Sequence, residues 1–531
     1  MKRSRPLHLF TLLIAFGLFC ALSAPAQTNA PPADLDSYVA RVLKTFEVPG
    51  ISVAIVKDGK VVFAKGYGVR KLGEPATVDE NTLFGIGSNT KAFTSAALTT
   101  LVDEGKIAWD DPVYERLPGF EMYDPYVSHE MTIRDLLCHR SGMSLGEGDL
   151  LFWPYTTYTR EEIIYRLRFM KPGSSFRSHF AYDNLLYIAA GQIIPAVTGK
   201  SWEDYIRERI LVPLGMNTTN LSNGAFRPGD NYAFPHAKLQ GKTQSVEFVN
   251  LDNAGPAGAI NSSAAEMTKW LLLQLNHGKF VDRDGRLFSE RQAREMWSAQ
   301  TILPVNNYPP PLAELSPKFS DYALGWFLRD YRGRKMVGHS GGVQGFVSRV
   351  MLVPEENLGV VILTNAEAGG AMESILMHIV DHYLGAPATD WTAGFKSLRE
   401  MQESGAAEVM KRQSGSRAAD SQPSLALEKY AGKYEDAWYG SATIQMEDGK
   451  LVFRLDHTPK AVADLQHWQY DTFKAHWRDA TIEDAFVTFD LKADGSIDHF
   501  TMAAVSPLAD FSFDYQDLFF KPAPAAASGQ K

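Results

Sequence analysis

A serine followed three residues later by a lysine is the first pairing in this chain that could do chemistry. Ser88 and Lys91 begin an alanine-rich, apolar run that continues to Glu104 and stops at Gly105, which predicts a buried helix. Residues three apart share one face of a helix, so the two side chains can touch. A serine hydroxyl needs a neighbouring base to become a nucleophile, and burial shifts a lysine toward its neutral, basic form. We therefore predict Ser88 as the nucleophile and Lys91 as its activating base.

The glycines before this pair supply a further catalytic element. Gly85-Ile86-Gly87 allow a sharp turn into the helix, which places the backbone N–H of Ser88 at the positive helix end, ready to face an oxyanion. The Ser-x-x-Lys motif alone is weak, and the chain repeats it by chance between Ser528 and Lys531. The Ser-x-x-Lys motif indicates a catalytic site only together with the two motifs described next.

A tyrosine and an asparagine form the second motif. Tyr182-Asp183-Asn184 is the only Tyr-x-Asn in the sequence. A phenol can relay a proton, and the amide of Asn184 can hold a substrate carbonyl. The alternative is that Tyr182 is a core aromatic residue whose hydroxyl is satisfied internally.

A glycine-rich stretch forms the third motif and permits two interpretations. Gly338-His339-Ser340-Gly341-Gly342 also fits the Gly-x-Ser-x-Gly nucleophile elbow, in which Ser340 would be the nucleophile of an α/β-hydrolase-type enzyme. An elbow needs a helix after the turn, whereas the valine-rich run Phe346–Val353 is flanked by Gly345 and Pro354 and favours a buried strand. Glycines beside a strand suit close approach of a ligand, which makes Ser340 and Gly341 candidate substrate-binding residues.

The order and spacing of the three motifs resemble those of the class C β-lactamase and DD-peptidase-like serine hydrolases. The resemblance covers about residues 35 to 385 and includes the stretches Thr132–Met143 and Leu214–Met216. It implies an α/β (α+β) domain in which an antiparallel sheet is flanked by helices and carries an inserted helical lobe. The C-terminal stretch Tyr430–Tyr434 resembles the lipocalin-like barrel attached to some of these hydrolases.

The resemblance also implies roles for the motif residues. The N–H groups of Ser88 and Gly342 would form the oxyanion hole, and Tyr182 would act with Lys91 as general base and then acid. His339 departs from the Lys-Thr/Ser-Gly motif of typical β-lactamases and resembles the esterase and D-amino-acid peptidase branches.

The histidine at this place changes the expected substrate preference. An imidazole has an unperturbed pKa of about 6.5 and is mostly neutral at pH 7, so His339 can donate a hydrogen bond or pass a proton to the leaving group. It supplies no permanent charge for a substrate carboxylate. We expect poor binding of penicillins and, as the pH falls toward about 6 and the imidazole gains charge, stronger acylation by them.

The pattern of short runs predicts how these motifs are positioned. Ile51–Val56 and Val61–Val69 read as two strands joined by an Asp-Gly hairpin turn. The three runs Met336–Gly338, Phe346–Val353 and Val360–Thr364 also read as strands. We therefore expect strands from both ends of one domain to share a sheet, with the largely helical region from Met131 to Met216 inserted between them.

Composition divides the chain into five parts. After the catalytic domain the apolar pattern is lost, and the stretch before Leu425 is rich in Ser, Gly, Arg and Ala. Seven or eight short alternating strands then suggest a small all-β barrel, expected to fold alone and to be dispensable for cleavage of small esters. The predicted parts are a signal peptide 1–26, a serine hydrolase domain 27–388, a linker 389–424, a lipocalin-like barrel 425–521 and a disordered tail 522–531.

The N-terminus and the charge predict export and narrow the partners. A cationic start, the apolar run Leu7–Leu22 and the cleavage site Ala24-Pro25-Ala26 indicate a signal peptide, hence a periplasmic or secreted protein without a stable membrane span. The net charge is −9, and no basic run follows, which argues against nucleic-acid binding. The expected partner is a small-molecule or peptide substrate.

The remaining reactive side chains favour structural roles. Cys138 is the only cysteine left after signal cleavage, on a predicted helix, and reads as a buried inert thiol. His378 and His382 are four residues apart on a predicted helix but have no third ligand in register, so we expect no metal and no cofactor. Besides an enzyme, the motifs fit a penicillin-recognising sensor that is acylated without turnover.

Overall fold

The catalytic motifs are positioned by one eight-stranded antiparallel sheet. In the computed structural model, which describes residues 29–227 and 229–524, strands from both ends of the hydrolase domain pair directly, with Ile51 opposite Thr364. This confirms the predicted shared sheet. Its order is β2 (Lys60–Gly68), β1 (Gly50–Lys57), β12 (Leu358–Thr364), β11 (Phe346–Val353), β10 (Arg334–Val343), β9 (Phe327–Tyr331), β8 (Ser320–Tyr322) and β7 (Thr301–Ile302).

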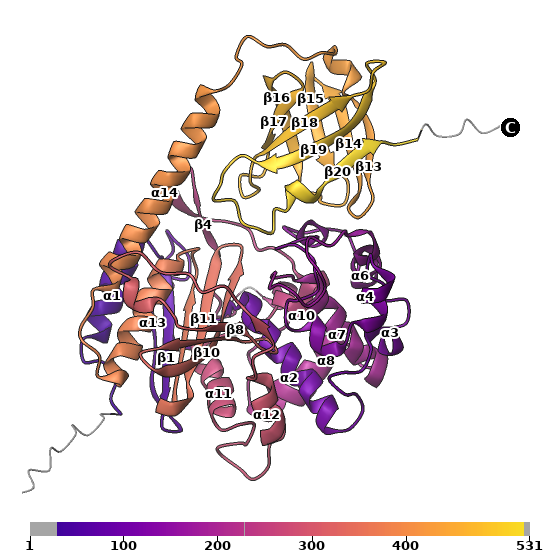
Figure 1. Ribbon diagram of the computed structural model, residues 1–531. Coiled ribbons are helices and arrows are strands. Elements are labelled where there is room, and N and C mark those ends of the chain that lie inside the picture. The colour runs from indigo at the N-terminus through magenta and orange to yellow at the C-terminus, as the bar shows by residue number, and fades with distance from the viewer. Residues whose placement is uncertain (1–28, 228, 525–531) are drawn as a thin grey trace, which may run out of the picture.

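Helices cover both faces of this sheet (Figure 1). On one face α1 (Leu35–Phe46) and α13 (Gly369–Leu384) share a hydrophobic core with β1 and β12. On the other face α11 (Ala264–Leu275) and α2 (Thr90–Asp103) pack into a second core. Because both faces are covered, every residue of β1 and β12 is buried.

The helical lobe is inserted between β2 and β7. Two short strands, β3 (Phe84–Gly85) and β6 (Asn261–Ser262), pair inside the insertion just before the catalytic turn, and β4 (His236–Leu239) and β5 (Lys242–Ser245) form a hairpin. The predicted helical region is confirmed. The lobe contains α3 (Val113–Arg116), α4 (Pro125–Glu130), α5 (Ile133–Leu136), α6 (Arg160–Arg166), α7 (Leu185–Thr198), α8 (Trp202–Ile206), α9 (Val212–Leu214), α10 (Gly255–Gly258) and α12 (Glu290–Met296).

The C-terminal region is a closed eight-stranded barrel, as the short alternating strands predicted. Asp448-Gly449 and Asp494-Gly495 lie in two of its hairpin turns. Pro522, placed in the tail by composition, belongs to the last strand. The strands are β13 (Gly432–Asp436), β14 (Gly440–Glu447), β15 (Lys450–Leu455), β16 (Val462–Gln469), β17 (Thr472–Trp477), β18 (Ala485–Leu491), β19 (Ile497–Ala504) and β20 (Phe519–Pro522).

The predicted linker is mostly one long helix. α14 (Trp391–Gly415) runs from the sheet domain toward the barrel (Figure 1). Asp390 caps it by accepting a hydrogen bond from the N–H of Ala393. After its first turns only Ala406 is buried, so the helix carries no apolar stripe, and periodicity could not reveal it. The predicted signal peptide and residues 525–531 of the predicted tail lie outside the described residues.

Candidate active site

The candidate nucleophile sits on a turn between a strand and a buried helix. Ser88 lies in the 3-10 turn Gly87–Asn89, after β3 and immediately before α2. The amide of Asn89 donates to the hydroxyl of Ser348 on β11 at 2.7 Å, which fastens this turn to the sheet. Ser88 itself is half-buried, so its hydroxyl can meet a substrate while its backbone is held.

Lys91 points its amine at this hydroxyl. Its Nζ lies 3.1 Å from Oγ of Ser88, 2.6 Å from Oδ1 of Asn184 and 3.1 Å from the carbonyl oxygen of Ala257. Burial lowers the pKa of Lys91 to about 7, against the attraction of Asp149 and Asp183. A neutral amine has two N–H groups and one lone pair; the two carbonyl oxygens accept the N–H groups, and the lone pair is left for the proton of Ser88.

Tyr182 completes this cluster from the other side. Its hydroxyl interacts with the side chain of Ser88, and burial raises its pKa. The amine of Lys91 lies 4.8 Å from the centre of its ring. The structure therefore brings Ser88, Lys91 and Tyr182 together, and Tyr182 is more than a core aromatic residue with an internally satisfied hydroxyl.

Two glycines allow the third motif to approach the nucleophile. Gly87 has a φ of 49°, and a Cβ on it would lie 2.7 Å from the backbone nitrogen of Gly342. A Cβ on Gly341 would lie 1.9 Å from the carbonyl oxygen of Ile86. Only glycine permits this contact between backbones, and it brings Ser88 and Gly342 to the same edge of the site.

The hairpin register directs the N–H of Gly342 toward that edge. Val343 and Phe346 close a two-residue turn between β10 and β11, and the closing pair of such a hairpin exchanges hydrogen bonds. Hydrogen-bonded pairs alternate along antiparallel strands, so the N–H of Gly342, opposite Val347, points away from β11. On its other side β10 pairs with β9 only as far as Gly338. The arrangement suits an oxyanion hole.

His339 is buried behind the site with both ring nitrogens occupied. Its side chain is 1% exposed; Nδ1 lies 2.5 Å from the carbonyl oxygen of Ser340 and Nε2 2.9 Å from the hydroxyl of Tyr322. Because a carbonyl only accepts, the neutral ring donates from Nδ1 and accepts the proton of Tyr322 at Nε2. Burial, then the charge of Lys91, holds the pKa of His339 well below its usual range.

This geometry corrects two expectations for His339. The ring has no free N–H with which to donate to a leaving group, and it does not gain charge near pH 6. The structure therefore argues against stronger penicillin acylation as the pH falls toward about 6, since burial costs the charged imidazole its solvation.

The nucleophile-elbow alternative is wrong. Ser340 lies within β10, and a two-residue hairpin turn to β11 follows, where an elbow requires a helix. Its side chain is exposed on the free stretch of β10, where a bound substrate could reach it. Gly341 is buried by the contact with Ile86.

Asn184 is tied into the catalytic cluster at both ends of its amide. Oδ1 accepts from Lys91, and Nδ2 donates to Oδ2 of Asp149 at 2.8 Å. At most one N–H therefore remains for a substrate carbonyl. Motif reasoning missed Asp149, which is fully buried, because no recognised spacing connects it to the other site residues.

His139 is a second residue that motif reasoning did not single out. It is buried against the ring of Tyr182, with ring centroids 4.2 Å apart, and its Nδ1 accepts from the N–H of Asp183 at 3.2 Å. A φ of 55° at a non-glycine residue marks a special backbone position. His139 thereby fixes the position of Tyr182.

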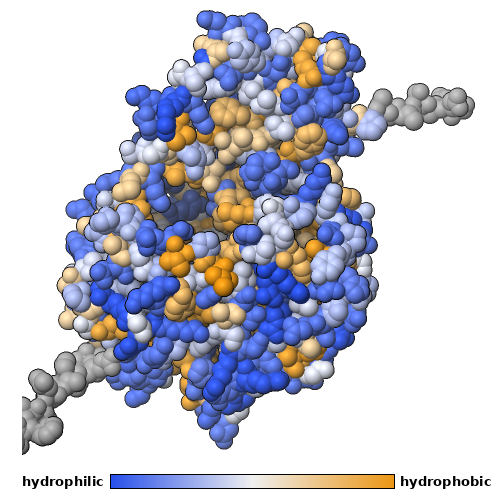
Figure 2. Space-filling model, viewed as in Figure 1, coloured by the Kyte–Doolittle hydropathy of each residue, from blue (hydrophilic) through white to orange (hydrophobic). Residues whose placement is uncertain are grey.

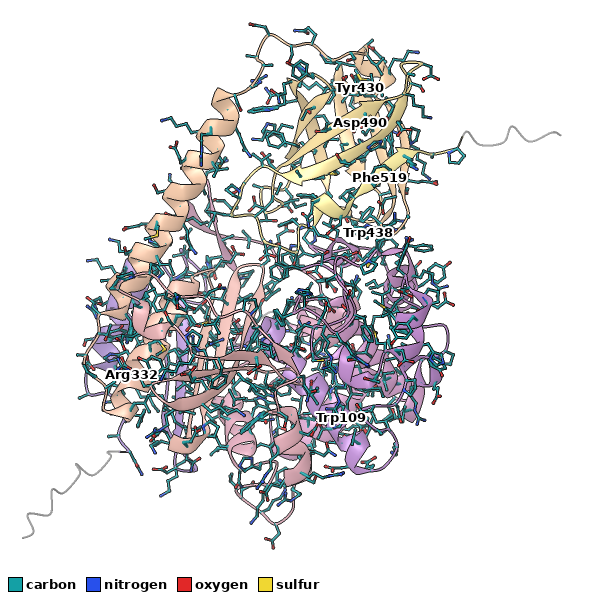
Figure 3. All side chains as sticks on the ribbon, in the orientation of Figure 1. Trp109, Arg332, Tyr430, Trp438, Asp490 and Phe519 are labelled. Atoms are coloured by element: carbon teal, nitrogen blue, oxygen red, sulfur yellow. The ribbon has the colours of Figure 1, made fainter. Side chains whose placement is uncertain are left out.

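A cleft between the hydrolase domain and the barrel adjoins the oxyanion edge. Its volume is about 540 Å³, and Gly342 forms part of its wall; Figure 2 shows the molecule hollowed between these two parts. Trp438, at the end of the barrel nearest the hydrolase domain (Figure 3), accepts through its carbonyl oxygen a hydrogen bond from Arg166. The apolar lining comes from both domains and includes Trp153, Phe346, Ile482, Leu508 and Phe513.

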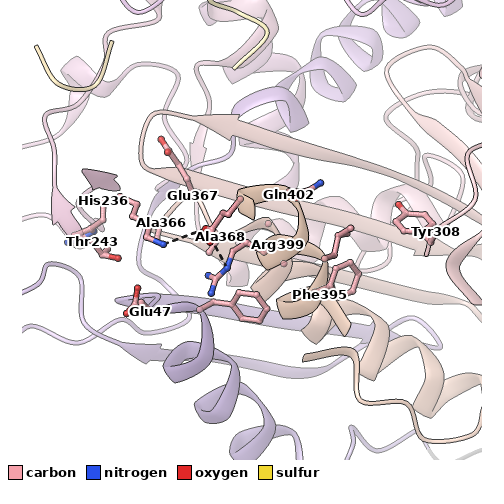
Figure 4. A pocket seen from close by; sticks show the side chains of 16 residues that line it. Glu47, His236, Thr243, Tyr308, Ala366, Glu367, Ala368, Phe395, Arg399 and Gln402 are labelled. Atoms are coloured by element: carbon pink, nitrogen blue, oxygen red, sulfur yellow. Dashed lines mark ion pairs between the residues drawn. The ribbon is translucent and has the colours of Figure 1, made fainter. Parts of the chain in front are cut away.

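Another cavity, of about 580 Å³, has none of the motif residues in its lining (Figure 4). It lies beside α14, where Glu403 forms ion pairs with Lys238 and Arg399. Since no nucleophile or base of the cluster lines it, this cavity is no candidate for the chemistry.

The other reactive residues have structural partners. Cys138 is fully buried, and burial raises the pKa of its thiol to about 12, which confirms an inert thiol. His378 lies 3.0 Å from the carboxylate of Asp34, whereas His382 lies 3.0 Å from the carbonyl oxygen of Ala30. Within residues 29–227 and 229–524, no helix combines the length and hydropathy needed to span a membrane.

A strand–turn–helix nucleophile with a buried lysine, on an antiparallel sheet with a helical lobe, defines a serine hydrolase of the penicillin-recognising class. The Beta-lactamase family model matches residues 35–383, and the chain belongs to this family. A second model, a domain of unknown function named DUF3471, matches residues 416–522.

Relatives support this assignment along much of the chain. The unguisins hydrolase ungD' of Aspergillus campestris is 32% identical over 456 residues, which cover 81% of each chain. The protein flp of Staphylococcus aureus is 29% identical and covers 67% of this chain and 68% of its own.

Solved structures share the fold. The octameric penicillin-binding protein homologue of Pyrococcus abyssi matches with a TM-score of 0.59 at 24% identity and covers 89% of this chain and 98% of its own. The D-amino acid amidase of Ochrobactrum anthropi matches with a TM-score of 0.53 at 24% identity and covers 66% of this chain and 98% of its own.

Proposed function

We propose that the protein is an exported serine hydrolase that forms an acyl-enzyme at Ser88 and cleaves amide or ester bonds. The observation that carries this proposal is the position of the Lys91 amine, within hydrogen-bond distance of Oγ of Ser88 and of two carbonyl oxygens. In the neutral amine these oxygens accept the two N–H groups, and the lone pair is left for the proton of Ser88. The export part rests on the N-terminal sequence alone, and places the enzyme in the periplasm or outside the cell.

The reaction follows from the positions of three side chains. Lys91 takes the proton of Ser88, and Oγ attacks the substrate carbonyl. The N–H groups of Ser88 and Gly342 stabilise the oxyanion. Tyr182, whose hydroxyl interacts with Ser88, passes the proton from Lys91 to the leaving group, which departs as an amine or alcohol. Water then attacks the acyl carbonyl, loses a proton to the same groups and releases the acid and free Ser88.

The cleft favours substrates without a carboxylate next to the scissile bond. Neutral His339 supplies no countercharge, and three carboxyl groups line the cleft beside Gly342: Glu367, Glu483 and Asp510. The lysine of this lining, Lys238, forms an ion pair with Glu403. Burial, then the neighbouring carboxyl groups, raise the pKa of Glu483, so a further carboxylate would bind there at a cost. The apolar walls instead suit an uncharged, bulky group.

The relatives narrow the proposed substrates. One relative is named as a hydrolase of unguisins, and the fold neighbours include a D-amino acid amidase and a D-stereospecific amidohydrolase. We infer that this enzyme cleaves an amide or ester next to a small or D-configured residue. Amides of D-amino acids are therefore the first substrates to assay, with the L-enantiomers as matched controls.

A time-resolved label separates an enzyme from a sensor. The protein is incubated with a fluorescent penicillin and, separately, with a chromogenic ester, and the acyl label and the released product are followed. We expect many molecules of ester product per molecule of protein, and a penicillin acyl label that decays with time. A stable label with stoichiometric product would show that the protein is acylated without turnover.

A further inference from the structure

The barrel reaches the active site through the segment between β19 and β20, residues 505–518. Within it the carboxyl group of Asp514 accepts hydrogen bonds from the N–H groups of Gly148 and Leu150, at 2.6 and 3.1 Å. The ring of Phe511 meets the ring of Tyr182 edge-on, with centroids 5.9 Å apart. This segment therefore contacts both the backbone around Asp149 and one of the catalytic side chains.

A chain of buried hydrogen bonds continues from this segment to the catalytic lysine. The hydroxyl of Ser512 donates to Oδ2 of Asp149 at 2.7 Å. The same oxygen accepts from Nδ2 of Asn184 at 2.8 Å, and Oδ1 of Asn184 accepts from Nζ of Lys91 at 2.6 Å. All four side chains are at most 9% exposed, so water does not compete for these bonds.

We propose that Ser512, a residue of the barrel, is a positioning residue for Lys91 and so makes the barrel part of the catalytic apparatus. The inference rests on the proposed function of Ser88 and Lys91. It names the residue through which the second domain acts on the first.

The chemistry of the four groups fixes one arrangement. In its ionised form, which prevails above the pKa of about 8 that burial gives it, Asp149 can only accept and so faces the NH2 group of Asn184. The carbonyl end of that amide is then turned to Lys91, where it accepts one N–H and leaves the lone pair for Ser88. A protonated Asp149 could instead donate, and the amide could turn around.

Ser512 stabilises the accepting form of Asp149. Burial raises the pKa of Asp149 to about 8, and the hydrogen bonds from Ser512 and Asn184 oppose this rise. Loss of the Ser512 hydroxyl would leave a buried carboxyl group with one donor fewer, and the orientation of Asn184 would no longer be fixed. The catalytic amine would then spend less time aligned with Ser88.

These hydrogen bonds between the barrel and the active site change what we expect of the barrel. The sequence placed no motif residue beyond Gly342, which suggested that small esters would be cleaved without the barrel. Ser512 and Phe511 lie against the catalytic cluster itself, so removing residues 425–521 would alter it even for a small substrate.

The test compares Ser512→Ala with Ser512→Thr in the full-length protein. Thr keeps the hydroxyl, whereas Ala removes it. The control is Lys460→Met, which breaks an ion pair of 2.7 Å between the barrel and Glu247 of the hydrolase domain without touching the hydrogen-bond chain. The rate constant of acylation, KM for p-nitrophenyl acetate and the melting temperature are measured for each variant.

We expect Ser512→Ala to acylate about tenfold or more slowly, the effect of losing a hydrogen bond to a charged group, with KM little changed. Ser512→Thr should recover most of the rate, and Lys460→Met should keep all of it. If Ser512→Ala does not fold, Ser512→Cys, which keeps the volume but donates weakly, should show the slow acylation.

The inference is overturned if Ser512→Ala or Ser512→Cys acylates at the wild-type rate, or if Ser512→Thr is no better than Ser512→Ala. A loss in Lys460→Met equal to that in Ser512→Ala would also overturn it, because general loosening of the interface would then suffice. Failure of the proposed function looks different: the wild-type protein itself would not be acylated at Ser88.

Discussion

The pH dependence of acylation tests whether Lys91 acts as a neutral general base. Burial holds the pKa of this lysine at about 7, and only the neutral amine can take the proton of Ser88. Because the pKa is lowered, the active form prevails above pH 7 and is lost as the pH falls. At a pH of about 5 roughly 1% of the amine is neutral, so acylation should be slower by roughly 100-fold than at its plateau.

The other titratable groups around Lys91 determine whether the fall of the acylation rate at low pH can be assigned to this lysine alone. Burial keeps the pKa of His339 well below 6.5 and raises that of Tyr182 above 10, so neither is expected to titrate between pH 6 and 9. Asp149 does titrate there, because burial raises its pKa to about 8. The titratable groups that face Lys91 are Asp149, Asp183, His139, His339, Tyr182 and Tyr187.

The assay is the second-order rate constant for a chromogenic ester, measured by stopped flow between about pH 5 and 9. Asp149→Asn is the matched variant: the carboxylate raises the pKa of Lys91, so its removal should move the limb to lower pH. A rate that stays level down to about pH 5, or a limb near the ordinary lysine value of about 10.4, would refute the assignment of a buried, neutral Lys91.

Three further substitutions have defined outcomes. Lys91→Met should abolish acylation yet raise stability at pH 7 by up to roughly 4 kcal/mol, because a lowered lysine pKa costs about 1.36 kcal/mol per unit while the amine is charged in the unfolded chain; an unchanged midpoint in urea would contradict this. Tyr182→Phe should slow acylation by ~2–4 orders of magnitude, measured with a chromogenic ester. An unchanged rate constant would show that Tyr182 takes no part in the mechanism. His339→Lys should raise penicillin acylation relative to ester cleavage, because an amine there offers a countercharge; an unchanged ratio of the two rate constants would exclude that explanation.

The sheet and the motif residues could be predicted because they depend on short sequence patterns, such as turn residues and residue spacing. The Asp-Gly turn after Val56 and the valine-rich run Phe346–Val353 fixed two hairpins, and the Ser-x-x-Lys spacing put two side chains on one helical face. These features depend on neighbours in the chain, which a single sequence displays.

Features that depend on distant contacts could not be predicted. Asp149 and Ser512 are 363 residues apart and meet only when the barrel docks. The neutral state of His339 depends on its burial and on the charge of Lys91, and its tautomer depends on Tyr322. The helix α14 was missed because its exposed surface carries no apolar repeat.

Mapping the residue that carries the acyl group tests directly whether Ser88 is the nucleophile. The protein is trapped with a fluorophosphonate, digested, and the modified peptide is sequenced by mass spectrometry, with Ser88→Ala and Ser340→Ala treated in parallel. Our account predicts the label on Ser88, its loss in Ser88→Ala and its retention in Ser340→Ala. A label on Ser340, or one that persists in Ser88→Ala, would contradict it.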